Sequence, residues 1–140
     1  EAKSKIAEMF LFMADRAEHI EEVIKKNKND TIISDRSMIS GIAYASALSI
    51  DELINLNLIA TNNTLPTHVI LLELTPHELK FRLSQKENDS IELRGIDYLI
   101  NIQNRMKETI KRLNINHIII DASLKIEEIE KKIEDFINGE

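Results

Sequence analysis

Three short apolar runs, each followed by a segment with helical periodicity, constrain the fold of this chain more than any other feature. The runs are Thr31–Ser34, His68–Leu74 and His117–Asp121. The second run, HVILLEL, is almost continuously apolar, as expected of a strand that is covered on both faces. Because predicted strands and helices alternate along the chain, the sequence predicts an α/β fold with a parallel sheet.

Local signals place the ends of several predicted helices. Ser49 and Glu52 form a capping-box pattern, and Thr75 followed by Pro76 is typical of a helix start. Gly139 is typical of a helix end. Apolar periodicity predicts helices over residues 4–26, 37–47, 49–60, 77–83, 91–113 and 126–137.

Composition limits the kinds of protein that this chain can be. Its 140 residues, 43% of them hydrophobic, predict one domain over residues 1–140 with a packed core. A net charge of −6 argues against a non-specific nucleic-acid binder. The sequence has no cysteine and no apolar run near the ~20 residues of a membrane span. We therefore expect a soluble, cytoplasmic protein with no nucleic-acid or membrane partner.

The charged pair that ends the first apolar run is the first candidate site. Asp35 and Arg36 directly follow Thr31–Ser34. In α/β proteins, ligands bind at the carboxyl ends of parallel strands. The planar fork of Arg36 suits a phosphate, and Asp35 could orient it or hold Mg²⁺ through water. Alternatively the two form a surface ion pair worth less than ~1 kcal/mol, and position alone does not decide between these readings.

Two other segments carry weaker candidates. Phe12 and Arg16 are four residues apart on one helix face, so a ring and a fork donor could contact a base together. Apolar helix positions are more often core, which would leave Phe12 buried and Arg16 solvated. Arg82 and Lys86 border a polar segment that could close over phosphates or be a solvated loop.

In order along the chain, these segments resemble the thymidylate kinase family. FMADRAEH (residues 12–19) resembles the F-x-x-(D/N)-R helix of that family, and DRSMISGIAYA (residues 35–45) resembles its DR-x-x-x-S-x-x-A-Y segment. LPTHVILLELTPHELKFRL (65–83) resembles its P-D-(x)n-L-D-(L/V)-x-P-E-x-x-x-x-R(L/A) stretch, and DSIE (89–92) resembles the D-(R/x)-(I/x)-E that follows its lid. HIIIDAS (117–123) resembles its last strand and adenine-side loop. The resemblance covers essentially the whole chain.

The resemblance implies a P-loop NTPase-like, three-layer αβα fold and transfer of the ATP γ-phosphate to dTMP, with Mg²⁺. It implies that Phe12 stacks on thymine, that Arg16 hydrogen-bonds the base and that Arg36 holds the dTMP phosphate. Asp35 would lie near Mg²⁺, which it would hold through water, and Tyr44 would pack against the sugar. The implied dTMP site comprises Phe12, Arg16, Arg36, Ser40, Gly41 and Tyr44.

On the ATP side, the resemblance implies a lid over residues 83–91. Arg82 and Lys86 would neutralise charge as the lid closes, and would join Asp35 and Arg36 as catalytic residues. The ATP side of the site would comprise Arg82, Lys86, Glu92 and Ser123. The resemblance also implies a homodimer through the first helix and the helix after Asp35-Arg36.

The sequence departs from the family pattern at several places. Glu73 replaces the usual Asp, Gly41 replaces a polar residue that touches the base in many members, and Ala45 replaces Gln. These changes imply fewer base contacts. The GxxxxGK(S/T) loop and the first two strands of the family are absent from the 140 residues. Because unpaired buried backbone groups cost ~1–3 kcal/mol each, we expect the molecule to include this segment, without which it would not transfer phosphate.

Two other functions are also consistent with the sequence. A deoxynucleoside kinase has a similar DRS-type motif and acts on a nucleoside. A non-catalytic fragment or interaction module could retain the helices of the fold without its chemistry. Activity on thymidine but not dTMP would favour the first, and normal folding without dTMP binding would favour the second.

Overall fold

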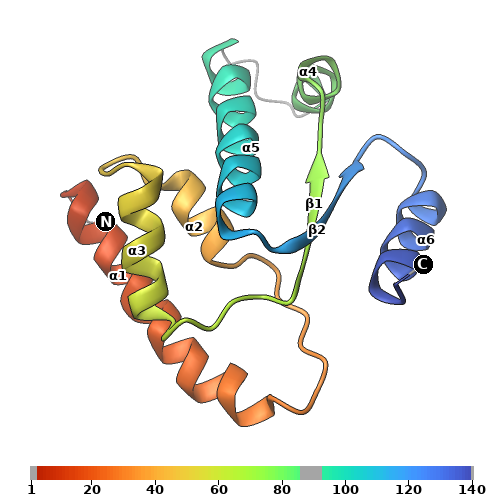
Figure 1. Cartoon of the computed structure of the whole chain (residues 1–140). Helices are drawn as coiled ribbons and strands as arrows, with labels where there is room; N and C mark the ends of the chain where they lie inside the picture. The colour runs from red at the N-terminus through yellow and green to blue at the C-terminus, as the bar shows by residue number, and fades with distance from the viewer. Residues whose placement is uncertain (1–2, 86–92, 140) are drawn as a thin grey trace. The chain divides into compact units, whose positions relative to one another are not determined.

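The computed structural model describes residues 3–85 and 93–139 of the chain (Figure 1). The chain forms two compact units, Glu1–Leu65 and Pro66–Glu140. A single domain over the 140 residues stays a prediction. No helix within the described ranges is long and apolar enough to cross a membrane.

In the first unit, all the regular secondary structure within the described residues is helical. One long helical stretch begins as α-helix and continues through a π-helical and a 3-10 turn, which agrees with the helix predicted over 4–26. Two shorter helices follow. The helical elements of this unit are α1 (Lys5–His19), η1 (Ile20–Ile24), η2 (Lys25–Asn27), α2 (Met38–Tyr44) and α3 (Ile50–Ala60).

Serine side chains begin the helices of this unit. The hydroxyl of Ser37 accepts a hydrogen bond from the N–H of Ile39 at 3.2 Å, which caps α2. Ser49 and Glu52 form the predicted capping box: Ser49 Oγ accepts from the Glu52 N–H, and the Glu52 carboxylate accepts from the Ser49 N–H at 2.9 Å. The hydrogen bonds from Ser49 lower the pKa of Glu52. These bonds satisfy backbone donors that have no partner inside the helix.

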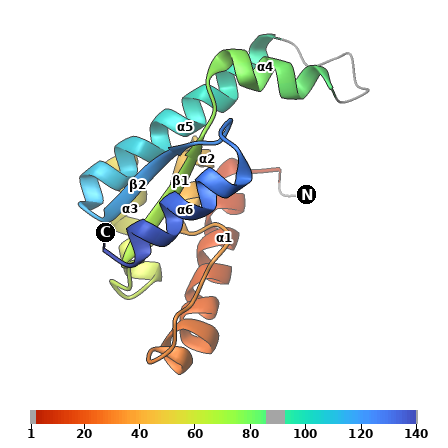
Figure 2. The ribbon, with the colours of Figure 1, turned by 90° about the vertical axis from the view of Figure 1, so that its right-hand side faces the viewer.

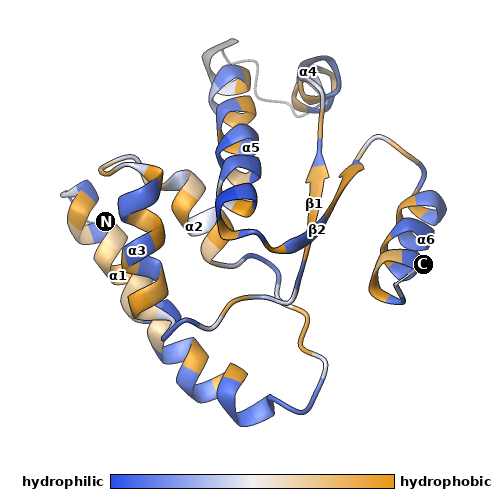
Figure 3. Ribbon diagram, in the orientation of Figure 1, coloured by the Kyte–Doolittle hydropathy of each residue, from blue (hydrophilic) through white to orange (hydrophobic). Residues whose placement is uncertain are grey.

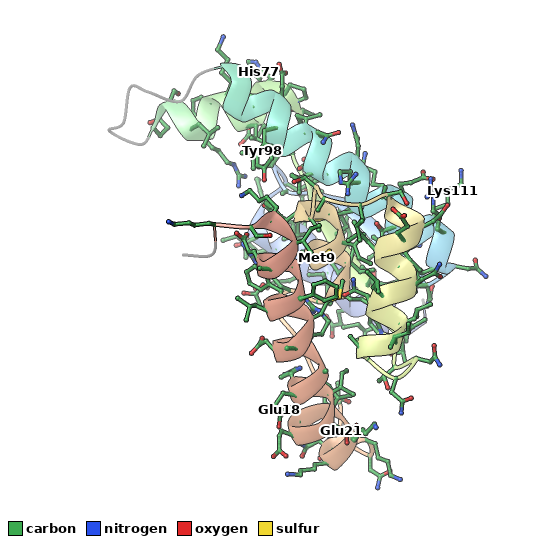
Figure 4. All side chains as sticks on the ribbon, turned by 90° about the vertical axis from the view of Figure 1, so that its left-hand side faces the viewer. Met9, Glu18, Glu21, His77, Tyr98 and Lys111 are labelled. Atoms are coloured by element: carbon green, nitrogen blue, oxygen red, sulfur yellow. The ribbon has the colours of Figure 1, made fainter. Side chains whose placement is uncertain are left out.

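Apolar side chains from all three α-helices form the core of the first unit. Ile42 of α2 and Leu53 of α3 are both 0% exposed. Met9 lies on the side of α1 toward α2 and α3 (Figure 4). The buried apolar residues of this unit are Met9, Met13, Ile20, Met38, Ile39, Ile42, Ala43, Leu53 and Ile54.

The prediction of a strand at Thr31–Ser34 is wrong. These residues form no strand, and Ile33 is 89% exposed. A strand is stable when its backbone N–H and C=O groups pair with a neighbour. Within residues 3–85 and 93–139 no segment pairs with Thr31–Ser34, so its high β propensity does not produce a strand.

The second unit contains a two-stranded parallel sheet, which confirms the α/β prediction at this level. Its strands pair in register, with Leu71 opposite Ile119 and Leu72 opposite Ile120. The helices between the strands provide the crossover that a parallel pair requires. The elements are β1 (His68–Glu73), α4 (Pro76–Ser84), α5 (Leu93–Leu113), β2 (Asn116–Asp121) and α6 (Ile126–Ile137).

Helices α5 and α6 lie on opposite faces of this sheet (Figure 2), and the strands between them are largely apolar (Figure 3). The rings of His68 and Phe136 meet edge to face at 5.4 Å, which ties β1 to α6. On the other face, Glu73 forms an ion pair with Lys107 of α5. The predicted ends also hold: Thr75 caps α4, and Gly139 has a φ of +77° just after α6.

Gln103 of α5 holds the carboxyl end of β1. Its amide oxygen accepts from the N–H of Leu74 at 2.9 Å, and its amide nitrogen donates to the C=O of Leu74 at 2.9 Å. One side chain therefore pairs both backbone groups of Leu74, as a neighbouring strand would. This contact fixes the position at which the chain leaves the sheet and enters α4.

The substitution Gln103→Leu is expected to lower the free energy of unfolding by about 1–3 kcal/mol, because it leaves two backbone groups of Leu74 without their partner. Urea denaturation measures this change. Asn104→Leu, at an exposed position one residue further along α5, is the matched control and should have little effect. Equal effects of the two substitutions would contradict the role given to Gln103.

Candidate functional site

The turn between Thr31–Ser34 and α2 holds Arg36 in an unusual backbone conformation. Arg36 has a φ of +72°, in the left-handed region, and the hydroxyl of Ser34 donates to the Arg36 carbonyl at 2.7 Å. Such a conformation costs a non-glycine residue on the order of 1–3 kcal/mol, and strain of this kind concentrates at functional sites. The next residue, Ser37, caps α2, so the turn and the helix start fix the backbone of Arg36 on both sides.

The structure brings Arg36 and Tyr44 together. The Arg36 Cζ lies 5.8 Å from the centre of the Tyr44 ring, within the range of a cation–π contact. Tyr44 is 40% exposed, so the ring retains an accessible surface. A guanidinium that stacks on a ring next to a turn can bind an anionic group.

The structure also brings Arg16 of α1 and Gly41 of α2 together. A Cβ atom built on Gly41 would lie 2.8 Å from Arg16 Nη2. Burial lowers the pKa of Arg16, and the charge of Asp15 acts in the opposite direction. An arginine nevertheless stays protonated, so Arg16 presents hydrogen-bond donors only.

Phe12 lies one helical turn before Arg16 and is 61% exposed. The alternative reading of Phe12 as a core residue is therefore wrong, and so is the reading of Arg16 as fully solvated, because Arg16 is partly buried. An exposed ring beside a partly desolvated guanidinium is a combination that a planar, hydrogen-bonding ligand can use.

The other predicted residues of the first unit have simpler surroundings. Ser40 Oγ donates to the Ser37 carbonyl at 3.1 Å, within the first turn of α2. Asp35 is exposed next to Arg36. The described residues contain no group of three or more His, Cys, Asp or Glu side chains that could hold a metal ion.

The second unit brings Arg82 and the loop of Ser123 together. Arg82 Nη2 donates to the carbonyl of Ala122 at 2.7 Å, and Arg82 Nε to Glu78 at 2.9 Å. The carboxylate of Asp121 accepts from the N–H and the hydroxyl of Ser123 at 2.8 and 2.6 Å. These bonds lower the pKa of Asp121, with a smaller contribution from the charge of Arg82.

Lys86, Glu92 and most of the predicted lid fall outside the described residues. Sequence reasoning missed two residues that the structure brings into these groups: Ser34, which closes the turn onto Arg36, and Asp121, which holds Ser123. The signal for Asp121 was present, because Asp-x-Ser after a strand is typical of a turn closed by the Asp side chain.

Comparison with known proteins gives consistent matches. A family model described as thymidylate kinase matches residues 1–133. The thymidylate kinase of Aliarcobacter butzleri is 81% identical over 138 residues, which are 99% of this chain and 73% of that protein. That of Nautilia profundicola is 52% identical over 96% of this chain and 70% of its own length. That of Campylobacter jejuni subsp. jejuni is 42% identical over 96% of this chain and 72% of its own length.

The hydrogen bonds to Asp121 predict a pH dependence of stability. Because the folded-state pKa of Asp121 is lowered, its contribution is present above the ordinary value of 3.8 and is lost as the pH falls through the lower folded-state value. Urea denaturation between neutral and acid pH should show a smaller acid loss of stability in Asp121→Asn than in the unaltered chain.

Asp30→Asn, at an exposed position of the first unit, is the matched control for Asp121→Asn. It should leave the acid loss of stability unchanged. An identical acid loss in Asp121→Asn and the unaltered chain would contradict the structural role of this carboxylate.

Proposed function

This chain belongs to the thymidylate kinase family, and we propose that it transfers the γ-phosphate of ATP to dTMP, giving dTDP. The observation that carries the proposal is the strained Arg36 turn, with its guanidinium over the Tyr44 ring and the partly buried Arg16 in the same unit. Phosphoryl transfer needs positioned cations more than covalent chemistry.

Arg36 binds the phosphate of dTMP in this proposal. Its turn is fixed by Ser34 and by the start of α2, so the backbone of Arg36 loses little conformational entropy on binding. Tyr44 supports the guanidinium and packs against the sugar. The bidentate fork of an arginine matches two phosphate oxygens, which suits a nucleotide better than a nucleoside.

Phe12 and Arg16 select the base. The exposed ring of Phe12 stacks on a pyrimidine, and Arg16 donates to acceptor atoms of its edge. Ser40 and Gly41 line the same pocket from α2. Partial burial of Arg16 strengthens its hydrogen bonds, because the surrounding dielectric is lower than that of water.

Arg82, Lys86, Glu92 and Ser123 form the ATP side of the proposed site. The hydrogen bond from Arg82 to the Ala122 carbonyl connects α4 to the loop that carries Ser123. Arg82 therefore orders this loop as well as supplying charge. Lys86 and Glu92 belong to the lid that this proposal closes over the phosphates.

Mg²⁺ and ATP complete the proposed reaction. Mg²⁺ is usually held by one or two carboxylates, water and substrate phosphates, and the single exposed carboxylate of Asp35 fits that donor set. The ion would neutralise phosphate charge during transfer. Asp35 would hold it through water, while Arg36 keeps the acceptor phosphate in place.

ATP binding in this proposal also requires a phosphate-binding loop of the P-loop NTPase fold. The 140 residues contain no GxxxxGK(S/T) sequence, so we propose that a further segment supplies it. The intact mass of the protein isolated from its natural host tests this step. A mass several kilodaltons above 16.1 kDa supports the step, and a mass of 16.1 kDa contradicts it. A cytoplasmic location and the absence of nucleic-acid and membrane partners stay predictions.

A two-fold dimer is a further part of the proposal. Helix α1 exposes Ile6, Phe10 and Leu11, which are 49%, 52% and 64% accessible, and these apolar side chains suit a partner copy. Together with α2 they would form the interface.

Sedimentation equilibrium at micromolar concentration should show a dimer, and Leu11→Glu should shift it to monomer because it places a charge in an apolar contact. Ile59→Glu, at a position of α3 that is 77% exposed, is the matched control and should stay dimeric. A monomer for the unaltered chain would contradict the dimer.

Arg36→Ala tests the proposed function most specifically. It should lower kcat/KM for dTMP about 100-fold or more, because it removes the phosphate donor, while changing the free energy of unfolding by less than ~1 kcal/mol. A coupled assay for dTDP and urea denaturation measure the two effects. Arg112→Ala, in an ion pair of α5 with Glu108, is the matched control.

The outcomes of this test separate the alternatives. Unfolding of Arg36→Ala, with full activity in the remaining folded molecules, would favour the surface ion pair. Activity of the unaltered protein on thymidine but not dTMP would favour a deoxynucleoside kinase. Normal folding without dTMP binding would favour a non-catalytic module.

A further inference from the structure

Gly41 occupies a position where the backbone does not require glycine. It lies inside α2, which runs from Met38 to Tyr44, and a glycine in a helix interior is less stable than an alanine. A Cβ at this position would lie 2.8, 3.6 and 3.9 Å from the Nη2, Cζ and Nε atoms of Arg16. Real Cβ atoms essentially never approach another heavy atom as closely as the first of these distances. The space that Gly41 leaves is therefore filled by the guanidinium of Arg16.

The group that would have to move is the end of a flexible side chain. Outside the neighbouring residues and the backbone of α2 itself, the three heavy atoms nearest to a Cβ at Gly41 all belong to the side chain of Arg16. An alanine at position 41 would therefore be accommodated by displacement of the guanidinium and not by a change of the fold. This alanine would therefore change the position of the Arg16 side chain, which is partly buried and has a limited choice of conformations.

We infer that Gly41 is a positioning residue for base selection: by lacking a side chain, it sets where the Arg16 guanidinium meets the pyrimidine. This inference rests on the proposed dTMP site. It changes the role of Gly41 from a residue that lines the pocket to one that acts through Arg16. A guanidinium has only donors, so its position decides which base edge it can satisfy. Thymine presents two carbonyl acceptors, whereas cytosine presents an amino donor in place of one of them.

The test is a double-mutant cycle that measures dTMP and dCMP affinity by calorimetry. It uses the unaltered protein, Gly41→Ala, Arg16→Ala and the double variant. Gly41→Ala should weaken dTMP binding about tenfold and reduce the preference for dTMP over dCMP, because one charged hydrogen bond is misplaced. In the Arg16→Ala background the same substitution should have no further effect. Gly95→Ala, in helix α5, is the matched control and should bind dTMP normally.

The outcomes distinguish this inference from the proposed function. If Arg16→Ala binds dTMP as tightly as the unaltered protein, the proposed base site fails, and this inference fails with it. If Arg16→Ala weakens binding and Gly41→Ala does not, the role of Gly41 alone is overturned. An equal effect of Gly41→Ala with and without Arg16 also overturns it, since Gly41 would then not act through that residue.

Two measurements on the protein without nucleotide separate a change in the position of Arg16 from a folding defect. The ¹⁵Nε–¹H resonance of Arg16 should move between the unaltered protein and Gly41→Ala, and the melting temperature of Gly41→Ala should be equal or higher. An unchanged Arg16 resonance in folded Gly41→Ala would show that the guanidinium does not move, and would overturn the inference.

Discussion

The requirement that backbone N–H and C=O groups find partners decides which parts of this chain are ordered as strands. β1 and β2 satisfy each other in a parallel ladder, and Gln103 extends the pairing to Leu74. This ladder fixes the start of α4 and the end of β2, and so the places from which Arg82 and Ser123 project. Thr31–Ser34 contains Ile32 and Ile33 but has no partner within the described residues, and it remains an exposed connection.

In the first unit, the groups proposed to bind dTMP depend on packing between helices. The buried apolar side chains of α2 and α3 hold α2 in place. Ser37, at the start of α2, fixes the turn that carries Arg36. The strain at Arg36 is retained because the bonds on both sides of it determine its conformation. Arg16 reaches α2 only because Gly41 leaves room for it. The proposed phosphate and base contacts thus both depend on the position of α2.

Much of this arrangement could be predicted from the sequence, because its signals are local. The capping box at Ser49, the helix start at Thr75 and Pro76, and the apolar strand that became β1 each depend on a few adjacent residues. The strand at Thr31–Ser34 was predicted wrongly because a strand needs a distant partner, which its own residues do not reveal. Neither the left-handed φ of Arg36 nor the contact of Arg16 with Gly41 has a sequence signal, since both arise from tertiary packing. The motifs nevertheless predicted membership of the thymidylate kinase family, and the comparisons confirm it.

The central claim is that Arg36 holds the phosphate and Phe12 with Arg16 holds the base of one bound dTMP. A crystal structure of the protein with dTMP tests this claim most directly. The account predicts phosphate oxygens within hydrogen-bond distance of the Arg36 guanidinium, with thymine stacked on Phe12 and accepting from Arg16. A dTMP molecule whose phosphate is bound by other residues, with the Arg36 guanidinium still only over Tyr44, would contradict it.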